Sequence, residues 1–368
     1  MSPQGSDTRS AGREGSRVPS ATRGERQRES RRQQRRRLLP LLVVGAAVVL
    51  IVGGLVAWSL RSPSTATTAA PRPPSTSPST TTTTAPAYLP PAVATTIAPP
   101  LAGEGHWAVA DSWSAGPPAV MTTTFRPDPT QPTITAYVTW MRSATTQLAL
   151  YPGYEGPGST PLNRGPEMVP QSAWPNLLAA FNSGFYESDA SAGFYTHGTL
   201  YFPMVNGLAT VVSYTDGTVD IVDWQGGPTP GPDILMARQN LPLLVDAGAA
   251  TAAAAVPSQW GVTLGGVPAV WRTGLGVDAK GNLLYVAASD QTAAGLAQIL
   301  IDVGAVRGMQ LDINPEWPIF VTYGGAGAVS PTLFVPNPNQ IPNRFLYSST
   351  KDFFALFQRL PGDLDQPW

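Results

Sequence analysis

Short runs of apolar or alternating apolar and polar residues recur along the chain after residue 132, separated by Gly, Pro, Asn and Asp. Runs of this kind are typical of strands in a turn-rich sheet. Six of them are TITAYVTWM (133–141), LLAAF (177–181), ATVVSY (209–214), TVDIVDW (218–224), LLYVA (283–287) and FVTY (320–323). The dipeptide Asp216-Gly217 joins two of them and predicts a hairpin, because glycine supplies the positive φ that a tight turn needs.

One segment, 292–304, has helical spacing instead. Its apolar positions fall on one face of a helix, and Gly304 stands where a C-terminal cap would be; these positions are Leu296, Ile299, Leu300 and Val303. Because such segments are a minority, the pattern predicts an α+β fold: a strand-rich, largely antiparallel or mixed sheet with a few helices.

Near the start, residues 38–60 contain 23 residues without a charge, more than the roughly 20 that cross a bilayer as a helix. A cleaved signal peptide is the alternative, but its apolar region is usually about 7 to 15 residues and ends in a small-residue cleavage site. We therefore expect one uncleaved transmembrane helix before the folded domain. The first 37 residues have eleven Arg and four acidic residues, a net charge of +7. The positive-inside bias then predicts a cytoplasmic N-terminus and a cell-membrane protein whose C-terminal domain is extracellular.

The remaining chain divides by composition. The composition of residues 1–37 predicts a basic, disordered cytoplasmic tail. Residues 61–100 are almost entirely Ser, Thr, Ala and Pro, which predicts an extended stalk. Residues 101–368 then form one large extracytoplasmic domain. With 10 basic and 20 acidic residues this domain has a net charge of −10, which argues against nucleic acid as a partner.

The absence of some residue types excludes whole classes of chemistry. The chain has no cysteine, so disulfides, cysteine nucleophiles and thiolate metal sites are excluded. It has only two histidines, which excludes a three-histidine zinc site. Neither a nucleophile-elbow nor a phosphate-loop motif is present. We predict no cofactor, and leave open whether a divalent metal assists the carboxylates.

Candidate chemistry gathers in three segments. In WRTGLGVD, a strand's period of two places Trp271, Thr273, Leu275 and Val277 on a core face and Arg272, Gly274, Gly276 and Asp278 on the other. The bare glycines would let a ligand approach while the guanidinium of Arg272 holds an anionic group. In the alternative reading Asp278 opens the turn DAKGN, Arg272 pairs with a nearby acid, and the glycines only relieve crowding.

The segment GAVRGMQLDINPEW predicts a second strand, in which Gln310, Asp312 and Asn314 share a face until Pro315 ends regular pairing. Asp312 and Asn314 either place chemistry at the rim of a sheet or make turn bonds of their own. In LAAFNSGFY, Asn182, Ser183 and Gly184 follow an apolar run and would offer an amide, a hydroxyl and bare backbone at another strand end. A simple strand-to-loop turn is the alternative there.

The order of these segments, over roughly residues 175–325, resembles the phosphodiester glycosidase family, to which the lysosomal uncovering enzyme belongs. NSGFY at 182–186 is similar to the family's N-x-G-F-F, and RTGLG at 272–276 to its R-T-A-x-G. In the third motif, L-D-G-G-G-S, only Leu311 and Asp312 match, because INPEW replaces the glycine-serine run. A flexible loop able to hold a phosphate has thereby become a stiffer one.

The resemblance implies a glycosidase-type hydrolase that cleaves a sugar-1-phosphodiester in a cell-envelope glycan or glycoconjugate. Positive charge builds on the sugar ring in such a reaction, so Asp312 is expected as nucleophile, base or ring-cation stabiliser and Glu316 as the second carboxylate. Arg272 would take up the phosphate charge, and Asn182 would bond sugar or phosphate. The other expected substrate-binding residues are Ser183, Gly184, Asp278 and Asn314. Glu316 and Trp317 are alternatively only parts of the turn.

Two other interpretations remain. A non-catalytic envelope protein of the same fold would bind a glycan or phosphorylated polymer, with Trp271 or Trp317 stacked on a sugar. An anchored structural module would have no small-molecule cleft. If Asn182, Arg272 and Asp312 converge in one pocket, the hydrolase and the glycan-binding protein are favoured. If they lie apart, the structural module is favoured.

Overall fold

The computed structural model describes residues 87–111, 116–157, 165–190, 192–261, 263 and 266–359. The predicted tail, the predicted transmembrane segment and residues 61–86 of the predicted stalk lie outside the described residues. Within the described part, no helix is long and apolar enough to cross a membrane.

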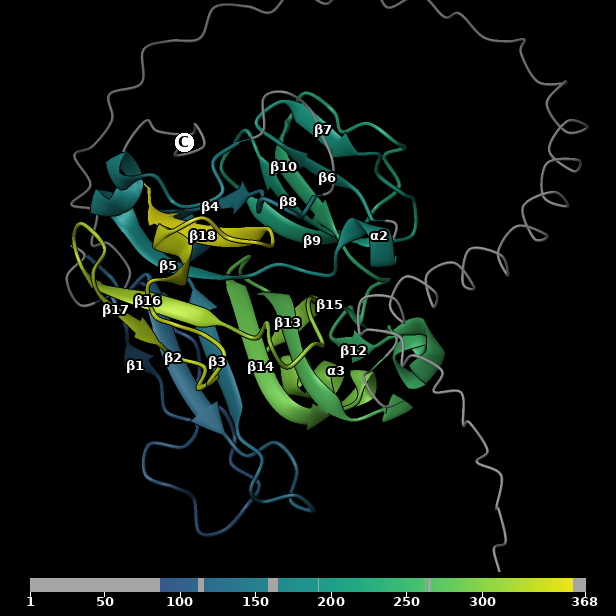
Figure 1. Ribbon diagram of the computed structural model, residues 1–368. Helices are drawn as coiled ribbons and strands as arrows, with labels where there is room; N and C mark the ends of the chain where they lie inside the picture. Colours follow the sequence, from purple (N-terminus) through teal and green to yellow (C-terminus); the bar gives the residue numbers. More distant parts are fainter. Residues whose placement is uncertain are drawn as a thin grey trace, which may run out of the picture. The chain divides into compact units, whose positions relative to one another are not determined.

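Three antiparallel sheets make up the folded unit (Figure 1). In spatial order the first contains β1 (Ala108–Val109), β2 (Val120–Phe125), β3 (Ala136–Met141), β14 (Leu283–Gln291), β13 (Val270–Asp278), β15 (Ala305–Gln310), β11 (Val245–Asp246) and β12 (Ala249–Ala250). The second contains β17 (Val329–Leu333), β16 (Phe320–Gly325), β5 (Leu177–Asn182), β18 (Phe353–Gln358) and β4 (Thr146–Tyr151). The third contains β7 (Thr199–Phe202), β6 (Phe194–Thr196), β10 (Ile234–Gln239), β8 (Ala209–Tyr214) and β9 (Val219–Asp223).

Helices are short and few among the described residues. The α-helices are α2 (Glu187–Ala190) and α3 (Ala293–Asp302), and the short 3-10 helices are Ser143–Thr145, Gln171–Asn176, Ala252–Ala255, Pro257–Gln259 and Arg344–Leu346. The strand-rich, antiparallel class predicted from the sequence is confirmed. So is the hairpin of β8 and β9, whose Gly217 has φ 84°.

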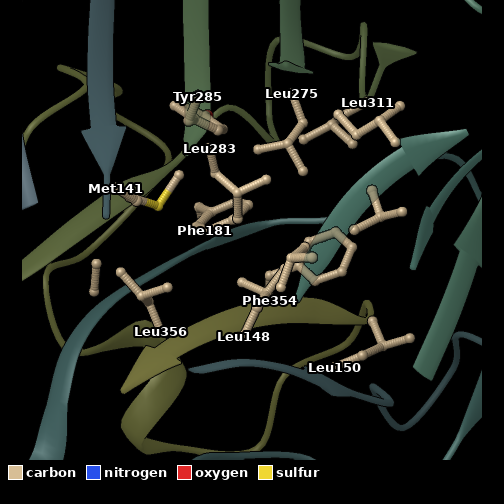
Figure 2. Close-up of a cluster of buried hydrophobic side chains, with 14 of the residues drawn as sticks. Met141, Leu148, Leu150, Phe181, Leu275, Leu283, Tyr285, Leu311, Phe354 and Leu356 are labelled. Carbon is tan, nitrogen blue, oxygen red and sulfur yellow. The ribbon is translucent and has the colours of Figure 1, made fainter. Parts of the chain in front are cut away.

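The central core is built by all three sheets. Alternating side chains of β13 and β14 face those of β5, β18 and β4, and aromatic rings fill the middle (Figure 2). Phe181 stacks on Phe320 with centroids 5.4 Å apart and contacts Tyr285 at 5.3 Å. Leu275 and Val277 lie in this core, as the period of two in WRTGLGVD predicts.

The opposite face of β13 packs against α3 (Figure 1). A Cβ at Gly274 would lie 3.3 Å from the Leu296 side chain of α3, and one at Gly276 would lie 3.2 Å from the Leu300 side chain of α3 and 2.8 Å from the Ala305 Cβ of β15. The glycines therefore admit a helix. The expectation that they let a ligand approach the strand is wrong, because α3 occupies that face.

Residues 87–105 belong to the folded unit, which begins earlier than the boundary expected at residue 101. Val93 is buried in the cluster beneath α3, and its backbone N donates to the Gly105 carbonyl at 2.9 Å. The Glu104 carboxylate pairs with Arg126 at 2.8 Å, and Arg126 also donates to the carbonyl of Pro99. A buried ion pair thus fixes this segment on β2 despite its linker-like composition.

Candidate functional site

All three segments singled out in the sequence meet at the junction of the first and second sheets. Asn182, at the end of β5, donates from Nδ2 to the Thr273 hydroxyl on β13 at 3.0 Å. The same hydroxyl accepts from the backbone N of Asp312 at 2.9 Å, just beyond β15. Two backbone hydrogen bonds, Thr273 N to the Asp312 carbonyl and Leu311 N to the Thr273 carbonyl, extend the ladder past the end of β15. The junction therefore places Asn182, Thr273 and Asp312 together.

A buried ion pair lies at this junction. The Asp312 carboxylate accepts from the Lys351 ammonium through Oδ2 and from the Asn314 backbone N, at 2.8 Å, through Oδ1. Asp312 is 2% exposed and Lys351 6% exposed, so both charges are withdrawn from water. Desolvating two charges is expensive, and such a pair is weak evidence for stability by itself.

Aromatic rings surround the ammonium of Lys351. Its Nζ lies 4.7 Å from the ring centroid of Tyr186 and 5.1 Å from that of Trp317. The Arg344 guanidinium lies 5.2 Å from the same Trp317 ring. Burial, with the nearby carboxylates of Glu155, Asp352 and Asp312, raises the pKa of Tyr186 well above its ordinary value. The result is a cationic region bounded by π faces.

A second buried pair supports the first. Asp352, the residue after Lys351, accepts from Arg238 Nε on β10 at 2.8 Å, and Arg238 Nη2 donates to the Phe185 carbonyl at 2.5 Å. Asn240 accepts from the Phe185 N at 3.2 Å and donates to the carbonyl of Leu311 at 2.7 Å. These bonds fix the 183–186 segment beside Asp312. Gly184 is required there because a Cβ would lie 2.9 Å from Asn240 Cγ.

A small cavity opens among these groups. Its lining includes Asn182, Ser183, Trp317, Lys351 and Asp352, and its volume of about 10 Å³ suffices for about one water molecule. The Ser183 hydroxyl is buried and has no hydrogen-bond partner among the residues that the structure describes, so it can bond a ligand atom that enters. Asn182 is not free: Nδ2 donates to Ser183 O and Thr273, and Oδ1 accepts from Tyr285 and Ile319. Its amide is thus saturated by the scaffold.

Arg272 lies beneath the junction, on the α3 side of β13. Its Nε donates to the Gln291 carbonyl at 2.7 Å, Nη1 to Gln310 Oε1 at 2.5 Å and Nη2 to the Pro268 carbonyl at 3.0 Å. Burial lowers the pKa of Arg272 to about 10. Its hydrogen-bonding partners among the described residues are neutral, so the alternative of a nearby acid is not found. The guanidinium ties three strands and their loops together.

Three expected site residues serve turns. Asp278, at the far end of β13, accepts from the backbone N of Lys280 and Asn282 and from Trp140 Nε1, as the turn reading predicts. The structure does not bring Asp278 to the junction. Asn314 Oδ1 accepts from the Glu316 N at 3.0 Å, which is the expected Asx-type turn bond. Glu316 is exposed and does not line the cavity.

Sequence reasoning missed Lys351, Asp352, Arg238 and Asn240. One signal was available: Lys351 is one of two lysines in residues 101–368, and Lys351-Asp352 precedes the apolar run of β18. Charged residues before a buried strand are candidates for burial at its end. Among the described residues, no group of three or more His, Asp or Glu side chains is arranged to hold a metal ion.

No family model matches the chain, and no curated protein sequence does. Among solved structures, the chain is similar to the zebrafish N-acetylglucosamine-1-phosphodiester alpha-N-acetylglucosaminidase catalytic domain, auto-inhibited by its pro-peptide. That similarity has 16% identity and a TM-score of 0.46, over 69% of this chain and 88% of that one. The chain is also similar to a hypothetical protein from Synechocystis, with 13% identity and a TM-score of 0.34, over 67% of this chain and 64% of that one. Values this low identify neither a family nor an activity.

Proposed function

We propose that the protein hydrolyses a sugar-1-phosphodiester, with Asp312 and Lys351 as its reacting pair. The observation that supports this most is the buried contact of these two side chains beside the unpartnered hydroxyl of Ser183. A carboxylate, an ammonium and a hydroxyl in one desolvated site are the groups that such a reaction uses.

The chemistry follows from charge. In the free protein, Lys351 neutralises Asp312. An entering phosphodiester takes over the ammonium, because phosphate is itself an anion, and the Asp312 carboxylate becomes free to face the anomeric carbon. The bond between the anomeric carbon and the phosphate oxygen then breaks. Its electron pair leaves with the phosphate, whose charge Lys351 and the Ser183 hydroxyl stabilise. Water supplies the hydroxyl that completes the sugar, and its other proton goes to the released phosphate monoester.

This assignment changes three roles expected from the sequence. Arg272 becomes a positioning residue, because all three of its nitrogens donate within the scaffold. Asn182 likewise positions Thr273 and Asp312 rather than the sugar. Glu316 is left outside the mechanism because it is exposed and forms no ion pair with Lys351, whereas Asp312 is buried against Lys351, which lines the cavity. Because that cavity holds only about one water, sugar entry requires displacement of Lys351 or of the turn at 314–317.

The cellular setting is part of the proposal. We propose that residues 38–60 anchor the protein in the cell membrane with the folded unit outside, so that the substrate is a glycan or glycoconjugate of the cell envelope. The uncharged length of this segment and the +7 charge before it support this topology. A reporter fused after residue 368 that is active only in an extracytoplasmic location would agree with it, and a reporter active only in the cytoplasm would reject it.

Assay of the full chain for sugar release from a panel of sugar-1-phosphodiesters tests the activity. Wild type and Asp312→Asn are compared, with Glu316→Gln as the matched carboxylate control. We expect release by wild type and Glu316→Gln and loss in Asp312→Asn. Equal release by all three chains would remove Asp312 from the mechanism.

A specific observation favours a second function, glycan binding without hydrolysis. Both oxygens of Asp312 are engaged, Glu316 lies outside the cavity, and the carboxylate that does line the cavity, Asp352, is paired with Arg238. The second, free carboxylate usual in glycosidases is therefore lacking among the residues that line this cavity. Absence of release from every substrate, together with binding that survives Asp312→Asn, would select this function.

A further inference from the structure

An open groove lies beside the junction and is not used by the proposed reaction. It is lined by Val270, Trp271, Ser289, Asp290, Ile313 and Pro315 and has a volume of about 390 Å³. This is within the roughly 300 to 1,000 Å³ of small-molecule sites, and far larger than the cavity beside Lys351. Two of its walls come from the same segments as the junction: Trp271 precedes Arg272, and Ile313 follows Asp312.

The backbone is irregular where the groove is formed. The pairing of β13 with β14 shifts register between Val270 and Arg272, which leaves Trp271 at a bulge. Opposite it, Asp290 has φ 57°, a left-handed conformation that aspartate adopts more readily than most residues. Bulges of this kind redirect side chains and are common next to binding sites.

The side chains combine one large aromatic surface with polar groups. Part of Trp271 packs on the central core, and the rest lines the groove with the apolar side chain of Ile313. Ser289 and the exposed Asp290 supply a hydroxyl and a carboxylate. A sugar ring has a matching character, because its C–H face packs on an aromatic ring while its hydroxyls donate to a carboxylate.

We infer that this groove is a glycan-binding subsite that holds a neutral sugar ring against Trp271, with hydroxyls donated to Asp290. The carboxylate disfavours acidic sugars, so the preferred glycan is neutral at this position. The inference deepens the proposed function and rests on it only in the choice of a sugar substrate. It adds that the glycan extends beyond the ring that reacts at Asp312.

Binding in the absence of turnover tests the subsite. The full wild-type chain is purified in a detergent without a sugar headgroup and titrated calorimetrically with phosphate-free oligomers of glucose, mannose, N-acetylglucosamine and galacturonic acid, which lack the phosphodiester that the proposed reaction would cleave. Trp271→Leu removes the aromatic face but keeps an apolar side chain. Trp107→Leu is the matched control, since Trp107 is also half-buried but packs on the cluster beneath α3. Asp290→Asn removes the charge while retaining a residue that tolerates the left-handed conformation.

We expect at least one neutral oligomer to bind, with a dissociation constant that rises about tenfold or more in Trp271→Leu and is unchanged in Trp107→Leu. We expect Asp290→Asn to narrow the preference for neutral over galacturonic oligomers. A purely structural role for Asp290 would leave that preference unmoved. Binding by none of the oligomers, or equal losses in both tryptophan variants, would overturn the inference.

The two proposals fail separately. Trp271-dependent binding together with no sugar release by wild type would leave the subsite standing and reject the hydrolase. Sugar release that requires Asp312, with no oligomer bound in the groove, would leave the hydrolase standing and reject the subsite.

Discussion

Asp312 and Lys351 are 39 residues apart in sequence, yet their side chains form an ion pair that joins the end of β15 in the first sheet to the start of β18 in the second. Each lies at one end of an interior strand in a different sheet, so neither sheet alone would bring the charges together. The pair is therefore a product of how the sheets pack on the central core, and it depends on that packing being correct.

Removing one member of this pair tests how strongly it is buried. Lys351→Met leaves the Asp312 charge without its partner in a site that is nearly closed to water, and we expect a loss of about 3 to 5 kcal/mol in unfolding free energy. The double variant Lys351→Met with Asp312→Asn removes both charges and should recover much of that loss. Denaturant unfolding measures each chain.

The matched control is the pair of Arg307 and Asp220, whose side chains are 36% and 31% exposed. Asp220→Asn should cost no more than about 1 kcal/mol, because water solvates the remaining charge. If Lys351→Met cost as little as this control, the pair would be solvent-accessible in solution.

The pair of Glu104 and Arg126 predicts a pH dependence. Hydrogen bonding from Arg126, the largest cause, lowers the pKa of Glu104 from 4.5 to about 2. Because the folded pKa lies below the unfolded one, the stabilisation is fully present above about pH 4.5 and is lost as pH falls through about 2. Glu104→Gln should therefore be less stable than wild type at neutral pH, and the difference should shrink steadily as pH falls below about 4.5.

A pH series of denaturant unfolding on both chains checks this. Asp128→Asn is the exposed comparison: hydrogen bonds from Thr130 within a local turn also lower the pKa of Asp128, so the same trend is expected there, but weaker than for the buried pair of Glu104. A stability difference between wild type and Glu104→Gln that stayed constant down to pH 2 would contradict the assigned cause.

The glycines of β13 give a third prediction. Gly276→Ala would place a Cβ 2.8 Å from that of Ala305 on β15 and 3.2 Å from the Leu300 side chain of α3, so we expect a loss of about 1 to 3 kcal/mol from overpacking. In Gly324→Ala the new Cβ would have ordinary contacts at 3.5 Å, and the backbone there is not left-handed. Gly324→Ala should thus be neutral or slightly stabilising. Thermal unfolding of both variants compares them, and equal midpoints would mean that Ala305 of β15 and Leu300 of α3 do not pack this closely on Gly276.

Much of the fold follows from local patterns. The period of two places Leu275 and Val277 in the core and Arg272 on the opposite face, and the helical spacing of Leu296 and Leu300 predicts α3. What covers the second face of a strand cannot be read from that strand alone. The glycines of WRTGLGVD fit a ligand or a helix equally well, and only the tertiary packing decides that they meet α3.

Local patterns predict only part of the candidate site. Asp312 and Asn182 were found because each follows an apolar run that ends in polar residues. Lys351 was missed because its contact with Asp312 joins two sheets, and no local spacing encodes such a contact. Asp278 and Asn314 show the converse case: their turn bonds are local, and the turn interpretation of each is confirmed.

Substitution of Arg272 tests most directly whether this residue clamps a phosphate, as the family resemblance implies, or holds the strands together, as its hydrogen bonds indicate. If it clamps a phosphate, Arg272→Lys should reduce sugar release while leaving stability nearly unchanged, because the positive charge is retained. The geometry predicts instead that stability falls strongly in Arg272→Lys. A lysine has one ammonium in place of three differently directed nitrogens, so it cannot bond the Gln291 carbonyl, Gln310 and the Pro268 carbonyl together. We expect a loss of about 2 kcal/mol or more in unfolding free energy, since buried acceptors are left unpaired.

Any loss of sugar release in Arg272→Lys should appear mainly as a lower kcat, because Thr273 and Asp312 shift, with KM little changed. Denaturant unfolding and steady-state kinetics on the same preparation decide between the roles. A stable Arg272→Lys chain with a strongly raised KM would restore Arg272 as a substrate-binding residue.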